Sequence, residues 1–157
     1  MKLGYLLIFF STLLITGCNL PSGETNQSGP TVPADMDRET ELKFTQYWTQ
    51  GRMLYKKRCL NCHQNSGKGM QQLIPPLAGS DYLKNTEKAA CAIRHGLKGE
   101  IVVNDTVFNG IMPANKDLTP IEIAELLTYV GNTWGNTVGF TTVKDAEKLL
   151  ANCAEAE

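Results

Sequence analysis

The sequence has no surplus of basic residues. Its 157 residues include 15 lysines and arginines against 16 aspartates and glutamates, for a formal net charge of −1. Proteins that bind nucleic acids usually concentrate positive charge against the phosphate backbone. We therefore expect no nucleic-acid partner.

Residues that commonly bind zinc are also scarce, with 2 histidines and 5 cysteines in the chain. A structural zinc site needs four ligands, which usually come as two closely spaced pairs. Cys59 and Cys62 form one such pair, and the sequence contains no second pair at similar spacing. This lack disfavours a zinc site.

Long apolar runs are missing except at the N-terminus, where residues 6–15 follow Lys2 and precede Cys18. The run is short for a membrane span, and the order of these features is that of a secretory signal. The letters ITGC, which end at Cys18, resemble the lipobox of bacterial lipoproteins. We therefore predict a signal peptide over residues 1–17 and a lipid on Cys18. An uncleaved anchor helix and a signal cut elsewhere are the alternatives. In the favoured case the protein is lipid-anchored to a bacterial membrane and faces the periplasm.

One folded domain follows a polar linker, and no internal repeat is visible. Residues 18–37 are rich in Gly, Ser, Pro, Thr and Asn, which predicts a flexible tether, and residues 38–157 remain for the domain. Apolar residues recur at helical spacing over residues 39–59, 85–96, 118–134 and 141–153. Helix starts are indicated at Asn85 or Thr86, at Thr119 with Pro120 and Glu122, and at Thr142 with Asp145. The predicted class is all-α with four to five helices, a short hairpin possible near 101–109, and long loops that wrap around something.

The letters CLNCH at residues 59–63 allow half a zinc site, a dithiol redox centre or a covalent haem attachment. A thioredoxin-like dithiol would follow a strand, whereas Cys59 follows a predicted helix. The motif C-x-x-C-H is the signature of c-type haem attachment. It predicts that the thiols of Cys59 and Cys62 form thioethers with the vinyl groups of one haem c, and that His63 is an axial iron ligand.

The second axial ligand decides between an electron carrier and an open site for small ligands. Candidates are Met36, Met53, Met70, Met112 and His95. Met112 is favoured because it lies on a loop that Pro113 stiffens, and His95, at a helix end, is its rival. The apolar residues expected around the haem are Leu54, Leu73, Leu77, Ile93, Leu97 and Ile111.

Two cysteines remain without a role, Cys91 and Cys153. An even remainder in an exported protein suggests a disulfide between the central and last helices. The alternative is two small buried residues that are not bonded.

Taken together, these residues resemble class I c-type cytochromes from about Thr40 to the C-terminus. The family spacing G-x-x-x-aromatic-x-x-x-C is matched by Gly51, Tyr55 and Cys59. The resemblance implies that these residues cross the C-terminal helix at Leu126 and Tyr129. It also implies that the carbonyl of Pro75 accepts the Nδ1–H of His63 and that Leu77 packs on the haem.

The resemblance narrows to a bacterial subgroup through the letters PPLAGSDYL and GLKGEIVVNDTVFNGIMPA. That subgroup occurs as free carriers and as domains fused to copper nitrite reductases, quinoprotein dehydrogenases or oxidase subunits. Asp105 replaces the glycine that is usual in its hairpin turn.

The implied function is that of an electron-transfer protein rather than an enzyme. It would pass single electrons from respiratory-chain or dehydrogenase donors to a terminal oxidase or reductase. A haem subunit of a dehydrogenase or nitrite reductase complex is the alternative. A second alternative is a haem-based sensor or a peroxidase with an open distal site. Di-haem peroxidases need two C-x-x-C-H motifs, however, and the sequence has one.

Overall fold

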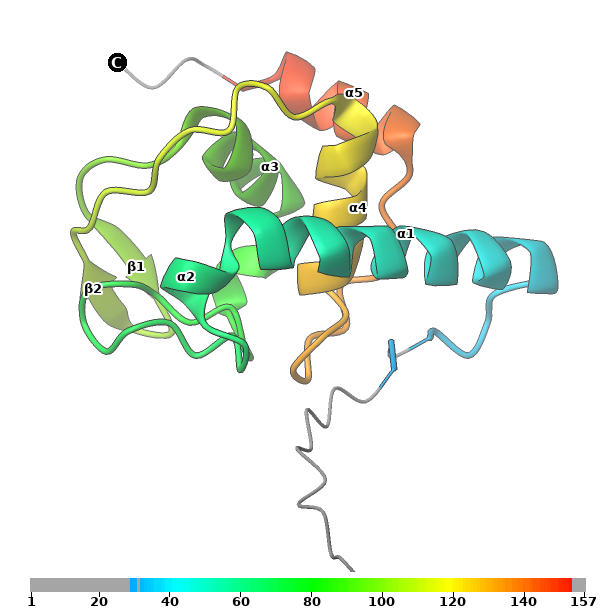
Figure 1. Ribbon diagram of the computed structural model, residues 1–157, viewed down its shortest axis with the longest axis horizontal. Helices are drawn as coiled ribbons and strands as arrows, with labels where there is room; N and C mark the ends of the chain where they lie inside the picture. Colours follow the sequence, from blue (N-terminus) through cyan, green and yellow to red (C-terminus); the bar gives the residue numbers. More distant parts are fainter. Residues whose placement is uncertain (1–28, 31, 154–157) are drawn as a thin grey trace, which may run out of the picture.

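The computed structural model describes residues 29, 30 and 32–153 (Figure 1). The predicted signal peptide, Cys18 and the first part of the predicted tether lie outside these residues. Within the described part, no helix combines the length and the apolar character that crossing a membrane requires.

The elements confirm a mostly helical fold with one small hairpin. In chain order they are α1 (Arg38–Arg58), α2 (Leu60–His63), the 3₁₀ helix η1 (Asp81–Lys84), α3 (Thr86–His95), β1 (Ile101–Val103), β2 (Thr106–Phe108), α4 (Pro120–Val130) and α5 (Val143–Ala151). α1 crosses in front of α4, and α2 lies with the hairpin toward one end of the molecule (Figure 1). α5 packs on α3 and α4.

Local capping rules placed the helix starts correctly. Asn85 accepts from the backbone of Lys88, and reciprocal capping boxes start α4 at Thr119 and α5 at Thr142.

The predicted extension of α4 to Trp134 is wrong, because the helix ends at Val130. The side-chain amide of Asn132 donates to the carbonyls of Thr128 and Gly139 at 2.7 and 2.8 Å and accepts from the N–H of Gly139 at 2.9 Å. These bonds hold the outgoing chain in a turn and compete with further helix.

The core forms where α1 meets α4. A Cβ on Gly51 would lie 2.0 Å from the carbonyl oxygen of Glu125, so the two helix backbones are in contact there. Around this crossing the rings of Trp48, Tyr55 and Tyr129 pack together, with Tyr129 centred 5.3 Å from each of the other two. The crossing fixes where the C-terminal end of α1 lies.

The hairpin turns at Asn104 and Asp105, which both adopt positive φ angles, 48° and 58°. This conformation is the one that two-residue hairpin turns require. Asn104 is tied to Asp81 by two side-chain–backbone bonds, of 2.9 and 3.0 Å, in opposite directions. These bonds attach the turn to η1.

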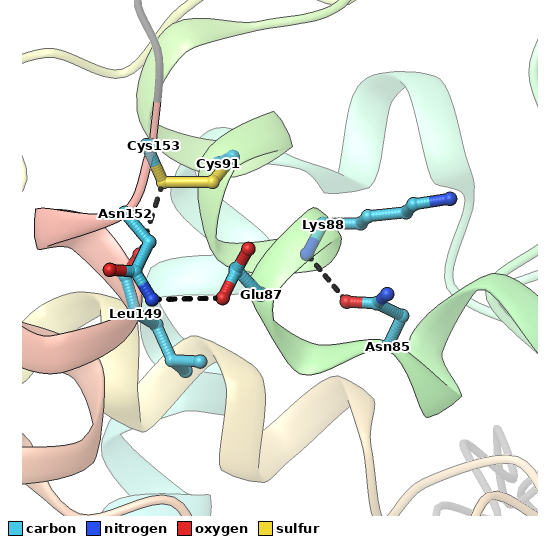
Figure 2. The surroundings of a disulfide bond; sticks show 7 residues. All are labelled: Asn85, Glu87, Lys88, Cys91, Leu149, Asn152 and Cys153. Carbon is cyan, nitrogen blue, oxygen red and sulfur yellow. Dashed lines mark hydrogen bonds between the residues drawn. A yellow bond between two sulfur atoms is a disulfide. The ribbon is translucent and has the colours of Figure 1, made fainter.

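Cys91 of α3 and Cys153, beyond the end of α5, are joined by a disulfide that spans 62 residues (Figure 2). Beside it, the amide of Asn152 donates to the carboxylate of Glu87 at 3.0 Å. The end of the last helix is thereby fastened to α3.

We predict that replacing both Cys91 and Cys153 by serine lowers the free energy of unfolding by about 2–4 kcal/mol. The physical reason is that a cross-link closing a long loop restricts the unfolded chain. Urea denaturation of both proteins under non-reducing conditions measures the difference. Equal stabilities, or two free thiols at these positions by mass spectrometry, would contradict the prediction.

Candidate functional site

The CLNCH segment is positioned by the end of α1. The N–H of Cys59 donates to the carbonyl of Tyr55 at 2.8 Å, and α2 then carries Cys62 and His63 through one helical turn. The hydroxyl of Tyr55 donates to the carbonyl of Gln64 at 2.5 Å. The buried ring of Tyr55 therefore holds the turn that ends α2.

His63 is buried, with 8% of its surface exposed. Its Nδ1 lies 3.2 Å from the carbonyl oxygen of Pro75. Because that oxygen can only accept, Nδ1 carries the proton and Nε2 keeps its lone pair. Burial lowers the pKa of His63 below its ordinary value, while the bond to Pro75 acts in the opposite direction. The ring is thus a neutral base whose orientation is fixed.

The loop after α2 folds back to bring Pro75 to His63. The N–H groups of Leu77 and Ala78 donate to the carbonyl of Gly67 at 2.7 and 2.9 Å, and the N–H of Gly69 donates to that of His63 at 3.1 Å. Gly69 has a φ of 66°, and a Cβ there would lie 2.2 Å from the carbonyl oxygen of Ile74 and 2.6 Å from that of Pro75. Only glycine fits this close approach.

Two adjoining hollows meet at the site. The first, of about 630 Å³ with its open mouth included, is lined by Cys59, His63, Pro75, Pro76, Leu77, Ser80, Tyr82, Leu83, Ala89, Ala92, Ile93, Leu97, Ile101, Val103, Met112, Leu126 and Val130. The second, of about 480 Å³, is lined by Cys62, His63, Leu73, Ile74, Pro75, Leu97, Gly99, Ile101, Phe108, Gly110, Ile111, Met112 and Pro113. His63 and Met112 line both. The structure therefore brings both thiols, the imidazole and one thioether to the walls of a mainly apolar cavity.

A pair of backbone hydrogen bonds holds Met112 at the wall of the cavity. Its N–H and carbonyl each bond to Leu97, both at 2.9 Å. The rival His95 lies instead in a surface groove beside Glu87 and Cys91. Met53 and Met70 are 62% and 42% exposed and line neither hollow.

The predicted apolar pocket needs one correction. Leu54 packs against the core and lines neither hollow. Leu73 and Ile111 line the second hollow, as expected, and are 69% and 79% exposed. They lie on irregular loops at the mouth of this hollow, so little protein covers their side chains. Leu77, Ile93 and Leu97 line the cavity as expected.

The prediction missed the wall that the hairpin and η1 provide. Ile101, Val103 and Phe108 face the cavity from the two strands, and Tyr82 and Leu83 do so from η1. The alternating pattern of the hairpin was the signal that could have identified its inward-facing residues.

The thiols of Cys59 and Cys62 are both free. Burial raises the pKa of the Cys59 thiol to about 11, with a further contribution from Cys62. Dithiol redox centres depend instead on a lowered thiol pKa, so the site does not resemble one.

Within residues 29, 30 and 32–153, no group of three or more His, Cys, Asp or Glu side chains is arranged to hold a metal ion. The donor set fits haem c: two thiols for thioethers, an imidazole and a thioether for iron, and apolar walls for the macrocycle.

Comparisons with known proteins agree with this donor set. The sequence model of the family Cytochrome c matches residues 48–134. Cytochrome c-552 of Thermus thermophilus is 33% identical over 104 residues, which cover 60% of this chain and 79% of the relative. The cytochrome c subunit of the quinone-dependent alcohol dehydrogenase of Gluconacetobacter polyoxogenes is 32% identical over 100 residues. That match covers 60% of this chain but 21% of the subunit.

We predict that Gly69→Ala destabilises the protein more than Gly79→Ala. Both glycines have positive φ, 66° and 61°, so both substitutions cost about 1–2 kcal/mol of backbone strain. Only at Gly69 does the new Cβ also meet the carbonyl of Pro75, which adds about 1–3 kcal/mol of steric cost. Denaturant unfolding of the two variants measures the difference. Equal losses would show that the Pro75 carbonyl is not held by this close approach.

Proposed function

Because this chain belongs to the cytochrome c family, it is an electron-transfer protein with covalently bound haem c, and we propose that it is a membrane-tethered carrier of single electrons. The observation that carries this proposal is the cavity whose walls include Cys59, Cys62, His63 and Met112. Its donors and acceptors are other redox proteins, namely respiratory-chain or dehydrogenase donors and a terminal oxidase or reductase.

Each residue of the donor set has a distinct role in this proposal. Cys59 and Cys62 hold the haem through thioethers, His63 is the proximal ligand, and Met112 is the distal ligand. The carbonyl of Pro75 fixes the imidazole orientation and increases its basicity. When bound, the haem supplies a one-electron couple between ferrous and ferric iron.

The cavity walls suit electron transfer without bond changes. The mainly apolar lining excludes water and disfavours the additional positive charge of the ferric state, which raises the reduction potential. Hydrogen bonds hold both proposed ligands: the imidazole of His63 bonds to the carbonyl of Pro75, and the backbone of Met112 bonds to that of Leu97. We therefore expect little rearrangement during each redox cycle.

Partner proteins would dock where the second hollow opens. Cys62 is exposed, and Leu73 and Ile111 project beside it; we call Cys62, Leu73 and Ile111 the docking patch. No Asp, Glu, Lys or Arg occurs in residues 106–115, so the loop side of the patch is uncharged. A small apolar surface of this kind fits the weak, short-lived contacts of redox proteins.

The tether would attach far from this patch. The described part of the tether leads into α1 at Arg38, whereas Cys59 follows the opposite end of the same helix. A helix of 21 residues is about 30 Å long, so the described part of the tether joins the domain at the end of α1 that lies away from Cys59 (Figure 1). Anchoring on Cys18 would then confine the carrier near membrane enzymes without covering its docking surface.

A second candidate function is that of a haem subunit in a dehydrogenase complex. The similarity to the alcohol dehydrogenase subunit supports it, although this chain spans about a fifth of that subunit. A sensor or a peroxidase would require an open distal site.

We predict that Met112→Ala abolishes the weak long-wavelength absorption band by which ferric haem reports a methionine ligand. The variant should also bind added imidazole much faster, because no internal ligand has to leave. Visible spectroscopy and stopped-flow mixing of the haem-loaded protein measure both effects. Met70→Ala, which changes an exposed methionine outside the cavity, is the control. An unchanged band in Met112→Ala would refute the ligand assignment and show that another methionine binds the iron. Absence of the band from the unsubstituted protein would favour the sensor or peroxidase alternative, whose distal site is open.

We predict that Ile111→Glu slows electron transfer to the physiological acceptor about tenfold or more, because a charge would be desolvated in the docking contact. Leu42→Glu, at the far end of α1 and 62% exposed, makes the same charge change away from the patch and should leave the rate nearly unaltered. Stopped-flow oxidation of the reduced protein by candidate oxidases and copper nitrite reductases measures the rates. A small uncharged quinone serves as an acceptor that needs no docking. If both variants slow protein acceptors equally, the patch is not the docking surface.

A further inference from the structure

The segment that carries Met112 has little burial to hold it in place. Residues 109–117 form no helix or strand, apart from the single bridge at Met112. Ile111 is 79% exposed, and Pro113 and Ala114 are exposed as well. Leu118, which is 2% exposed, is the first fully buried side chain after Met112. Apart from Met112, which lines both hollows, the residues from 109 to 117 bury little side-chain surface against the protein.

Hydrogen bonds to the end of α3 hold the segment that carries Met112 in place. Besides the pair between Leu97 and Met112, two N–H groups of Asn115 reach the carbonyl oxygen of Ile93. The backbone N–H lies at 3.1 Å and the side-chain Nδ2 at 3.2 Å. The guanidinium of Arg94 donates to the carbonyl of Lys116 at 2.9 Å. Every one of these bonds ends on residues 93–97.

Asn115 donates hydrogen bonds to the carbonyl of Ile93, which has no donor within α3. Ile93 lies in the last turn of α3, where carbonyls lack a partner within the helix. The N–H of Leu97 would be its normal partner, but that group donates to Met112 instead. Asn115 thus takes the place of the Leu97 N–H as the donor to the Ile93 carbonyl. The contact of Asn115 with Ile93 and the contact of Met112 with Leu97 therefore depend on each other.

The backbone at Gly96 shows how close the two segments are. A Cβ on Gly96 would lie 2.4 Å from the carbonyl oxygen of Met112 and 2.9 Å from the N of Ala114. The loop therefore rests directly on the end of α3. α3 is itself fixed on its other side by the Cys91–Cys153 disulfide and the Glu87–Asn152 bond (Figure 2).

We propose that Asn115 is a positioning residue for Met112, acting through the end of α3, and that Arg94 assists it. The inference rests on the proposed function, because it requires Met112 to be the distal iron ligand. Loss of the Asn115 amide would increase the fraction of time that the loop spends away from the haem. Ligand exchange at the iron would then change while the attachment through Cys59 and Cys62 stays intact.

The test uses Asn115→Asp in the haem-loaded protein. This substitution keeps the shape and the backbone N–H but places an acceptor against the Ile93 carbonyl. Imidazole is the probe, because its binding to ferric haem requires Met112 to leave. We expect the imidazole binding rate to rise about fivefold to tenfold, the effect of one net hydrogen bond. The methionine–iron band should weaken in parallel.

Arg94→Gln provides a second variant, with a smaller rise in the same direction, and it decides the test if Asn115→Asp fails to fold. Two controls separate positioning from general destabilisation. Asn109→Asp makes the same charge change at an exposed position of the same loop. Thr142→Ala removes the capping box of α5, which costs about 1 kcal/mol at a distance from the loop. Neither control should alter the imidazole rate by as much as twofold.

The outcomes are distinguishable. If Asn115→Asp and Arg94→Gln behave like the controls while Met112→Ala loses the band, Met112 is the ligand and the positioning inference is wrong. If Met112→Ala leaves the band unchanged, the ligand assignment itself fails and the inference fails with it. A faster imidazole reaction in both test variants and in neither control supports the inference.

Discussion

The backbone contact between Gly51 of α1 and Glu125 of α4 constrains the whole site. A side chain at position 51 would overlap the Glu125 carbonyl, so the helices can approach this closely only at a glycine. Two turns further along α1 come Cys59 and then α2, while Leu126 and Val130 of α4 form part of the wall of the cavity. The crossing therefore sets the distance between the attachment segment and the wall that faces it.

The two proposed iron ligands are held in different ways. His63 belongs to a short helix that follows α1 after a turn at Cys59, and its partner Pro75 lies twelve residues later in a loop braced by backbone bonds. Met112 lies in an irregular segment that is held mainly by bonds to α3. Because segments with few buried contacts open most readily, the methionine side is expected to be the weaker side of the site.

Local rules predicted much of the fold, and they also indicated the proposed donor set, whose side chains line the two hollows. Thr119 and Thr142 cap helices through neighbours three residues away, and the C-x-x-C-H motif is equally local. Other features depend on partners far away in the sequence. The end of α4 at Val130 depends on the bonds of Asn132 to Gly139, and the exposure of Leu73 and Ile111 depends on which loops cover them. The proposed role of Asn115 depends on the carbonyl of Ile93, which has no partner within α3 and which no sequence pattern identifies.

The exposure of Ile111 also explains why backbone bonds are needed beside it. A docking surface that contacts partners briefly must leave apolar side chains in water, so the same side chains cannot bury themselves to hold the loop. In the proposed carrier, the loop next to Cys62 therefore has two conflicting requirements, because it has to be accessible to partners and has to keep Met112 fixed. Hydrogen bonds to Ile93, Arg94 and Leu97 meet both, since they fix the backbone while the side chains remain exposed. On this reasoning α3 holds the backbone of the loop, and the outer face of the loop is left free for a partner.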